Sequence, residues 1–143
     1  MKQTGYRRAT LLLCCCAVAS AMVQAAHAEL ISIPQKGFAS WYGEEHRGKL
    51  MANGQKFDPD KLTAASWFYP LGTRVRVTIN SPDFEPRSVL VTITDRGPAK
   101  RLVKQGRVID LGHAAFQKLA HPDCGLVQVV VEPVEYAGNA TSR

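Results

Sequence analysis

The sequence predicts a mostly β protein, a compact barrel of six short strands with one short helix. Two observations lead to this prediction. Six segments are rich in β-branched or aromatic residues, and Gly, Pro, Asn and Asp cluster between them. Only one segment places apolar residues at helical spacing. Many short strands combined with little helix are typical of a β-barrel.

The six predicted strands cover residues 38–42, 62–65, 74–79, 88–94, 108–111 and 125–134. The first is aromatic and ends in Trp41-Tyr42, and the second is short. The third alternates regularly, so that Val75 and Val77 share one face. Between the first two strands, residues 43–60 are rich in Gly, Asn and charge, which predicts a loop.

The second half of the chain repeats this alternation of strands and turns. Residues 88–94 give the strongest strand pattern, and Gly97-Pro98 ends that strand. The helix is predicted over residues 112–120, and Asp110 or Gly112 could cap its start. We interpret Asp110 as a helix cap rather than a catalyst. A disordered tail is expected over residues 135–143.

Residues 1–28 have the three parts of a secretory signal peptide. A basic start and a short apolar run precede Ala26-His27-Ala28, which supplies the small residues that signal peptidase needs. Cleavage is predicted after Ala28; a buried N-terminal helix is the alternative. No lipid anchor is expected, because Cys14 follows Leu13 rather than Gly, Ala or Ser. The sequence therefore predicts a periplasmic or secreted protein.

Charge and cysteine content exclude several classes of partner. The formal net charge of +6 falls to +3 when the three basic residues of the signal peptide are removed. No basic stripe appears, so nucleic acid is not an expected partner. Cys124 is the one cysteine left, and we expect it to be buried as a small apolar residue. His121 precedes it, but no second pair stands at metal-ligand spacing, so neither a metal nor another cofactor is expected.

Several motifs resemble a known family in their order and spacing over residues 37–134. They are Ala39-Ser-Trp-Tyr-Gly43, Ala52-Asn-Gly54, Phe57-Asp58, Leu62-Thr-Ala-Ala65, Pro70-Leu-Gly-Thr73, Thr94-Asp-Arg-Gly-Pro98 and Val108-Ile-Asp-Leu111. The sequence is similar to the RlpA-like domain of the rare lipoprotein A family. The resemblance implies a double-psi β-barrel, a fold shared with expansins. It also implies an endolytic lytic transglycosylase that cleaves peptidoglycan glycan strands, preferably without stem peptides, and forms 1,6-anhydro-muramic acid.

Two departures from the family pattern concern chemistry. Gln55 stands where the family often has Glu, and Ser66 stands where it often has His. In active relatives both positions are taken as catalytic or near-catalytic. Neither residue here can serve as a carboxylic acid or an imidazole base.

Asp95 is the predicted catalytic residue. On an alternating strand it follows Val91 and Ile93 on one face, while Arg96 points the other way. Apolar surroundings would raise the pKa of its carboxyl group, which suits a general acid. One carboxyl group can suffice, because the 6-hydroxyl of the muramic acid is itself the nucleophile. The alternative is a turn carboxylate that caps Gly97-Pro98.

Side chains near these motifs are the predicted substrate contacts. They are Trp41, Tyr42, Asn53, Gln55, Ser66 and Arg96. Trp41 and Tyr42 are neighbours on a strand, so one of them should face outward and could stack on a sugar. In the aromatic run Trp67-Phe68-Tyr69, at least one ring should lie near the surface.

Two other functions remain open at this stage. The first is a glycan-binding, expansin-like wall-remodelling module without catalysis, which the loss of Glu and His favours. The second is a structural partner of septal or cell-wall proteins. In each case the expected ligand is the glycan strand of peptidoglycan, and the expected state is a monomer.

Overall fold

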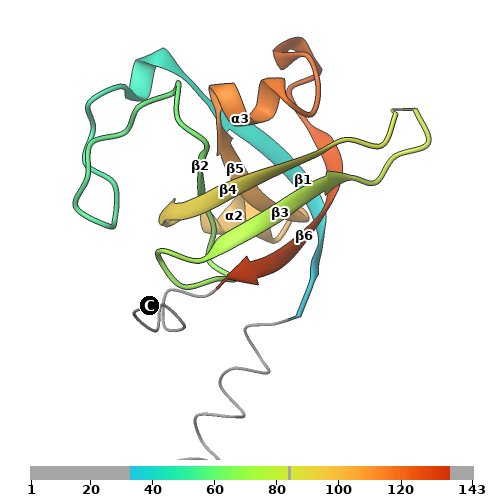
Figure 1. The fold of residues 1–143 in the computed structure, drawn as a ribbon, viewed down its shortest axis with the longest axis horizontal. Coiled ribbons are helices and arrows are strands. Elements are labelled where there is room, and N and C mark those ends of the chain that lie inside the picture. Colours follow the sequence, from blue (N-terminus) through green and yellow to red (C-terminus); the bar gives the residue numbers. More distant parts are fainter. Residues whose placement is uncertain (1–32, 84, 136–143) are drawn as a thin grey trace, which may run out of the picture. The chain divides into compact units, whose positions relative to one another are not determined.

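The computed structural model describes residues 33–83 and 85–135. Its strands are β1 (Gln35–Tyr42), β2 (Thr63–Ala65), β3 (Arg74–Ile79), β4 (Ser88–Asp95), β5 (Arg107–Gly112) and β6 (Val127–Glu135). They close into a barrel in the order β1-β5-β2-β4-β3-β6 (Figure 1). The predicted six-stranded barrel is confirmed, and the bounds of each strand lie within three residues of those expected.

Two parallel strand pairs give the barrel its topology. β1 pairs in parallel with β5, and β2 pairs in parallel with β4. The other neighbours pair antiparallel. Because β2 lies between β4 and β5, its last residues face the carboxyl-terminal part of both strands. This arrangement positions the candidate site.

Alternating strands fill the interior of the barrel. Every second residue of β3 is buried, including Val75 and Val77, and β4 does the same with Val89 and Val91. The third antiparallel partner, β6, adds Val129. Each such side chain contributes about 1.5–3 kcal/mol when it is fully buried. The alternation of apolar residues in the sequence therefore predicts correctly which side chains of these strands are buried in the core.

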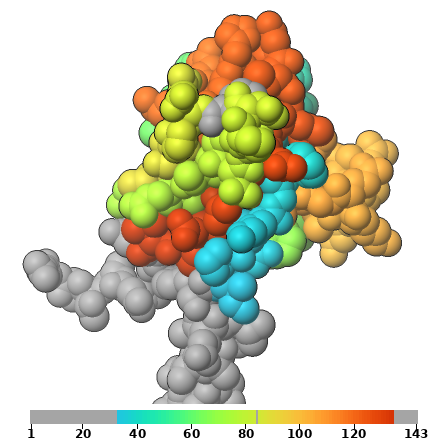
Figure 2. All heavy atoms as spheres, turned by 90° about the vertical axis from the view of Figure 1, so that its right-hand side faces the viewer, coloured from blue at the N-terminus to red at the C-terminus, as the bar shows by residue number. Residues whose placement is uncertain are grey.

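Two short α-helices accompany the strands. α3 (His113–Gln117) is the predicted helix, shorter than expected, and it buries Ala115 and Phe116. α2 (Lys100–Val103) is not predicted by the sequence, because its four residues carry two basic side chains and none is buried. In the space-filling view the chain around α2 projects from the body beside β1 (Figure 2).

Asp110 does not cap α3, so the interpretation of this residue as a helix cap is wrong. The N-cap is Gly112, and no side chain bonds the start of the helix. β5 continues through Gly112 and keeps Asp110 in extended backbone. Asp110 therefore belongs to a strand, and its neighbours are residues of the adjacent strands β1 and β2 rather than of α3.

Cys124 is exposed, so the prediction that it is buried is also wrong. It ends the 3-10 helix η2 (Pro122–Cys124), a surface turn. Gly125 follows with a φ of 65°, a left-handed conformation that favours glycine. The turn carries Cys124 outside the barrel before β6 begins.

Some predictions lie outside the described residues: the signal peptide over 1–28, cleavage after Ala28, and the tail over 136–143. β6 includes Glu135, so the last strand runs one residue beyond the expected end of the domain at 134. Within residues 33–83 and 85–135, no helix has the length and apolar character needed to cross a membrane.

Candidate functional site

Asp95 ends β4 at a β-bulge. Ala64 lies opposite Ile93 and Ala65 lies opposite Asp95, so Thr94 is an extra residue on β4. Ile93 and Thr94 are both buried, which means that the strict alternation stops at Ile93. The sequence predicts that Asp95 continues the apolar face of Val91 and Ile93; the bulge breaks that alternation and leaves Asp95 half-buried.

Two backbone N–H groups hold the carboxylate of Asp95. The N–H groups of Ala52 and Arg96 both donate to Oδ1, each at 2.8 Å. Among the residues that the structure describes, Oδ2 has no hydrogen-bond partner. Hydrogen bonds from N–H groups to a carboxylate are among the stronger ones in proteins. One oxygen of Asp95 is therefore held in place, and the other remains available to a substrate.

Residues 43–60 form the loop that delivers the Ala52 N–H group. The backbone N–H of Asn53 donates to the carbonyl of Thr94 at 3.1 Å. The hydroxyl of Thr94 lies 3.2 Å from the sulfur of Met51. The loop is thus bonded on both sides of Ala52 to the bulged residue before Asp95.

Arg47 closes the base of the same loop. Its guanidinium group forms ion pairs with Glu44 at 2.6 Å, Asp58 at 3.0 Å and Asp60 at 2.8 Å. The cluster is largely exposed, so solvent screens each pair and its contribution to stability is small. Its effect is to join the two ends of the loop that the sequence predicts over residues 43–60.

Asp110 is the second carboxyl group of the site. The hydroxyl of Ser40 on β1 donates to its Oδ1 atom, and the guanidinium group of Arg107 lies 3.8 Å from the same atom. Burial raises the pKa of Asp110, while Ser40 and Arg107 oppose that shift. Its side chain is still 21% exposed. Burial therefore favours the protonated form of this group, and its side chain remains partly accessible.

Ala65 lies between the two carboxyl groups. Its register partner on β4 is Asp95 and its partner on β5 is Asp110. Register partners direct their side chains to the same face of a sheet. Two strand spacings of about 4.8 Å separate their backbones. In the register of the strands a methyl group is the one side chain between the two acids, and it is itself buried.

Gly97 borders Asp110 on the side of the turn that follows β4. A Cβ atom at this glycine would lie 3.1 Å from the Cβ of Ala65 and 3.6 Å from Oδ2 of Asp110. The absence of a side chain therefore lets the turn pass close beside the carboxyl group. The glycine of the Asp-Arg-Gly-Pro motif consequently has a steric role in the site.

The hydroxyl of Tyr42 is a third polar group near these acids. Burial raises the pKa of Tyr42, and the charges of Asp95 and Asp110 raise it further. Its oxygen is buried and has no hydrogen-bond partner among the described residues. The ring lies against Phe57, with 4.4 Å between the ring centroids. The sequence singles out Tyr42 as a sugar platform, whereas the structure turns its hydroxyl toward the carboxyl pair.

The other predicted substrate contacts separate into two groups. Asn53 and Gln55 are exposed in the loop next to Ala52, and their side chains are 3.2 Å apart. Ser66 is completely buried, and its hydroxyl donates to the carbonyl of Val108 at 3.1 Å and accepts from the N–H of Phe68 at 3.2 Å. Ser66 thus has no group available for a substrate.

The side chains of Arg96 and Trp41 bond to backbone carbonyl groups, and these donors are not free for a substrate. Arg96 donates to the carbonyls of Ser66 and Tyr69, at 3.1 and 2.8 Å. Trp41 donates from Nε1 to the carbonyl of Pro122 at 3.0 Å. The ring of Trp41 also lies against α3, with its centroid 4.9 Å from that of His113. Both residues therefore support neighbouring segments of the site.

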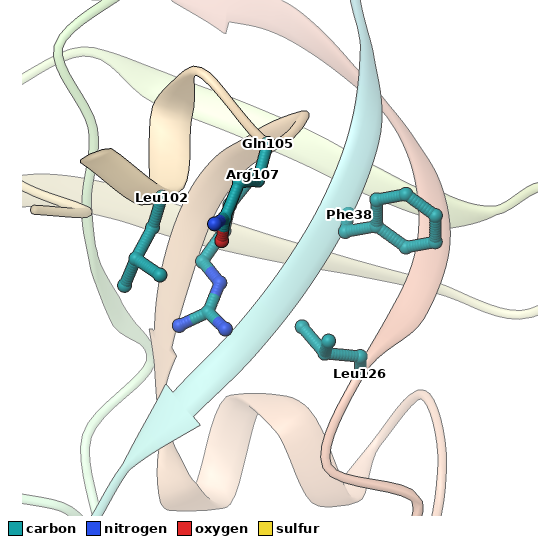
Figure 3. A pocket seen from close by; sticks show the side chains of 5 residues that line it. All are labelled: Phe38, Leu102, Gln105, Arg107 and Leu126. Atoms are coloured by element: carbon teal, nitrogen blue, oxygen red, sulfur yellow. The ribbon is translucent and has the colours of Figure 1, made fainter. Parts of the chain in front are cut away.

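A hollow of about 150 Å³ adjoins the site through Arg107. Its lining residues are Phe38, Leu102, Gln105, Arg107 and Leu126, shown in Figure 3. Phe38 and Arg107 come from β1 and β5, and the others from the segments around α2 and before β6. None of the predicted site residues lines this hollow.

Comparison with known proteins agrees with the fold and with the family resemblance. A family model described as lytic transglycolase matches residues 34–131. The endolytic peptidoglycan transglycosylase RlpA of Pseudomonas aeruginosa is 40% identical over 99 residues, which are 69% of this chain and 27% of that relative. The RlpA protein of Rickettsia felis is 36% identical over 115 residues, 78% of this chain and 46% of that relative. The chain therefore matches less than half of the length of either protein.

Solved structures show the same barrel. The Streptomyces papain inhibitor superposes with a TM-score of 0.55 at 26% identity, covering 72% of this chain and 96% of the inhibitor. An expansin of Clavibacter michiganensis superposes with a TM-score of 0.53 at 20% identity, covering 72% of this chain and 51% of the expansin. These neighbours establish the double-psi β-barrel that the family resemblance implies.

Proposed function

Because the chain belongs to the lytic transglycolase family, we propose that it cleaves the glycan strands of peptidoglycan, with Asp95 as its catalytic residue. The observation that carries this proposal is the placement of Asp95 and Asp110 on either side of Ala65. Two carboxyl groups in different surroundings are the usual apparatus for breaking a glycosidic bond.

The reaction would be an intramolecular transfer within the glycan. The bond between C1 of a muramic acid and the O4 atom of the next sugar breaks. A new bond forms between C1 and the O6 atom of the same muramic acid, giving a 1,6-anhydro sugar. O4 gains one proton and O6 loses one, so no water is consumed.

The two carboxyl groups suit these two proton transfers. Asp110, whose pKa is raised by burial, would give its proton to O4. Oδ2 of Asp95, the oxygen without a hydrogen bond in the described part of the chain, would take the proton from the 6-hydroxyl. Alternatively Asp95 performs both transfers alone. Replacing Asp110 distinguishes the two routes.

We also propose that the substrate is a glycan strand without stem peptides, cleaved internally. Asn53 and Gln55 lie exposed in the loop that holds Asp95, where a long strand in solvent can contact them. Exposed contacts suit the middle of a long strand. This substrate lies outside the cytoplasm, which agrees with the signal peptide predicted for residues 1–28.

The test is digestion of peptide-free glycan strands by the purified protein. Mass spectrometry of the products should detect new 1,6-anhydro-muramic acid ends, and these ends should be absent after treatment with Asp95→Asn protein. Products of intermediate length would demonstrate internal cleavage. A product with a reducing muramic acid end instead would identify a hydrolase and contradict the proposal.

The second candidate is a module that binds glycan without cleaving it. Two observations favour it: Ser66 is buried and engaged in the fold, and Gln55 is an amide that cannot ionise. In this case the protein would sediment with peptide-free glycan but release no product. Asp95→Asn would then leave the binding unchanged.

A further inference from the structure

Trp67 is an exposed tryptophan held in one orientation. It follows β2, and 44% of its surface is accessible, whereas Tyr69 in the same aromatic run is 2% accessible. The indole Nε1 donates to the carbonyl of Pro98 at 2.7 Å. A flat apolar ring fixed by a hydrogen bond at one edge costs little conformational entropy when a ligand binds to it.

The hydrogen bond connects Trp67 to the turn that borders the carboxyl groups. Pro98 follows Gly97, which lies close to Oδ2 of Asp110 and to Ala65. Trp67 also lies two residues beyond Ala65 in the chain. The hydrogen bond to Pro98 therefore links the ring to the turn that borders Asp110.

Lys100 adds a positive charge at the same place. It is the first residue of α2, and its ammonium group lies 4.9 Å from the centroid of the Trp67 ring. Within the described residues Lys100 forms no salt bridge. An exposed cation without an anionic partner next to an aromatic ring is complementary to a ligand that has an apolar face and a negative charge.

We propose that Trp67 and Lys100 form an accessory subsite for a sugar residue that carries a free carboxylate. Trp67 would stack against the apolar face of the sugar ring, and Lys100 would pair with the carboxylate. In a peptidoglycan strand that residue is muramic acid, whose lactyl carboxylate is free after the stem peptide has been removed. This inference rests on the proposed function, and it supplies a physical cause for a preference for peptide-free glycan.

The competing role for Lys100 is to cover the ring. A lysine stem can shield an aromatic surface from water while its charge stays solvated. Removing such a cover would strengthen stacking of any sugar. Removing a carboxylate partner would weaken binding of charged glycans alone. The two roles therefore predict opposite changes on substitution of Lys100.

Binding of two glycans tests the subsite. The full chain carries Asp95→Asn so that no glycan is consumed, and calorimetry measures Kd for peptide-free glycan oligomers and for N-acetylglucosamine tetramer, which has no carboxylate. Trp67→Ala should weaken both by about tenfold. Lys100→Ala should weaken only the peptide-free glycan, by about two- to fivefold, and added salt should remove that difference.

Matched controls come from the same surface. Lys104→Ala removes an exposed lysine next to α2, and Leu126→Ala removes an exposed apolar side chain elsewhere. Both should bind both glycans like the parent. If Trp67→Ala binds both as tightly as the parent, or if Lys100→Ala binds peptide-free glycan no more weakly, the subsite is rejected while the proposed function stands. A parent that binds neither glycan would reject both.

Discussion

The backbone N–H of Ala52 donates a hydrogen bond of 2.8 Å to Oδ1 of Asp95, across 43 positions of sequence. The bond joins the long loop of residues 43–60 to the end of β4. Because Arg96 donates to the same oxygen, the carboxylate is held from two sides. A catalytic carboxylate that is held in this way loses little entropy when the substrate arrives.

Asp95→Asn should abolish formation of 1,6-anhydro ends without unfolding the domain. The amide oxygen can still accept both backbone N–H groups, so a role limited to the turn would survive the change. The amide cannot take a proton from the 6-hydroxyl, and activity should fall by at least about 10²-fold. Mass spectrometry of glycan products measures the activity, and thermal unfolding confirms the fold. Full activity of this variant would remove Asp95 from the catalytic machinery.

Asp110→Asn should separate the two proposed routes of proton transfer. If Asp110 donates the proton to O4, its amide should lower activity by about 10²-fold or more. If Asp95 alone carries both protons, activity should change far less. The Ser40 hydroxyl can still donate to the amide oxygen, so the local structure should persist.

The same variant should change how stability depends on pH. Burial raises the pKa of Asp110 in the folded protein above its unfolded value of about 4. The folded state therefore holds this proton more tightly, and the stability it contributes below pH 4 is lost as pH rises through the folded pKa. Urea unfolding should show Asp110→Asn gaining stability relative to wild type as the pH rises from about 4 through the folded pKa of Asp110.

A suitable control for this measurement is Asp123→Asn. Asp123 is 91% exposed, so its substitution should not alter the pH dependence in this way. Parallel stability curves for Asp110→Asn and wild type would show that Asp110 titrates alike in the folded and unfolded chain. That result would remove the case for Asp110 as the proton donor.

Alternation of residues made the barrel predictable. Val75 and Val77 report the buried face of β3 in the sequence as they do in the structure. The bulge at Thr94 was not predictable, because an extra residue is defined by its pairing with Ala64 and Ala65 on another strand. It changes the surroundings of Asp95, the residue proposed to be catalytic.

The second carboxyl group illustrates the same limit. Asp110 stands just before a predicted helix, and a local reading favours a cap. Its partners, Ser40 and Ala65, lie 70 and 45 residues away in the chain. The parallel pairing of β1 with β5 brings Ser40 to it. A cue was nevertheless present, since Asp110 belongs to one of the motifs shared with the family.

Restoring the family residues should succeed at one position and fail at the other. Gln55 is exposed, so Gln55→Glu should fold normally and should raise cleavage if a carboxylate there assists the reaction. Ser66 is fully buried and bonded to Val108, so Ser66→His must insert a ring into occupied space. Such overpacking costs about 1–3 kcal/mol. Urea unfolding should show this loss for Ser66→His and for the double variant, but not for Gln55→Glu. A fully stable Ser66→His protein would show that the pocket around Ser66 is adaptable.

Tyr42→Phe should leave the domain as stable as wild type or more stable, while lowering its activity. The Tyr42 oxygen is buried and bonds no other described residue, so its removal leaves no partner unsatisfied. The ring contact with Phe57 is retained. Burial and the charges of Asp95 and Asp110 raise the pKa of this phenol, so it stays protonated at neutral pH. Its buried hydroxyl can donate to a substrate oxygen once the substrate has displaced the side chains that cover it. Loss of such a hydrogen bond should reduce cleavage by about tenfold, measured as anhydro ends released over time. A marked loss of stability would instead show that the hydroxyl serves the fold, and unchanged cleavage would exclude it from the reaction.

Phe57→Leu is the matched control, because it disturbs the same ring packing and leaves the hydroxyl in place. It should lower stability with a smaller effect on cleavage.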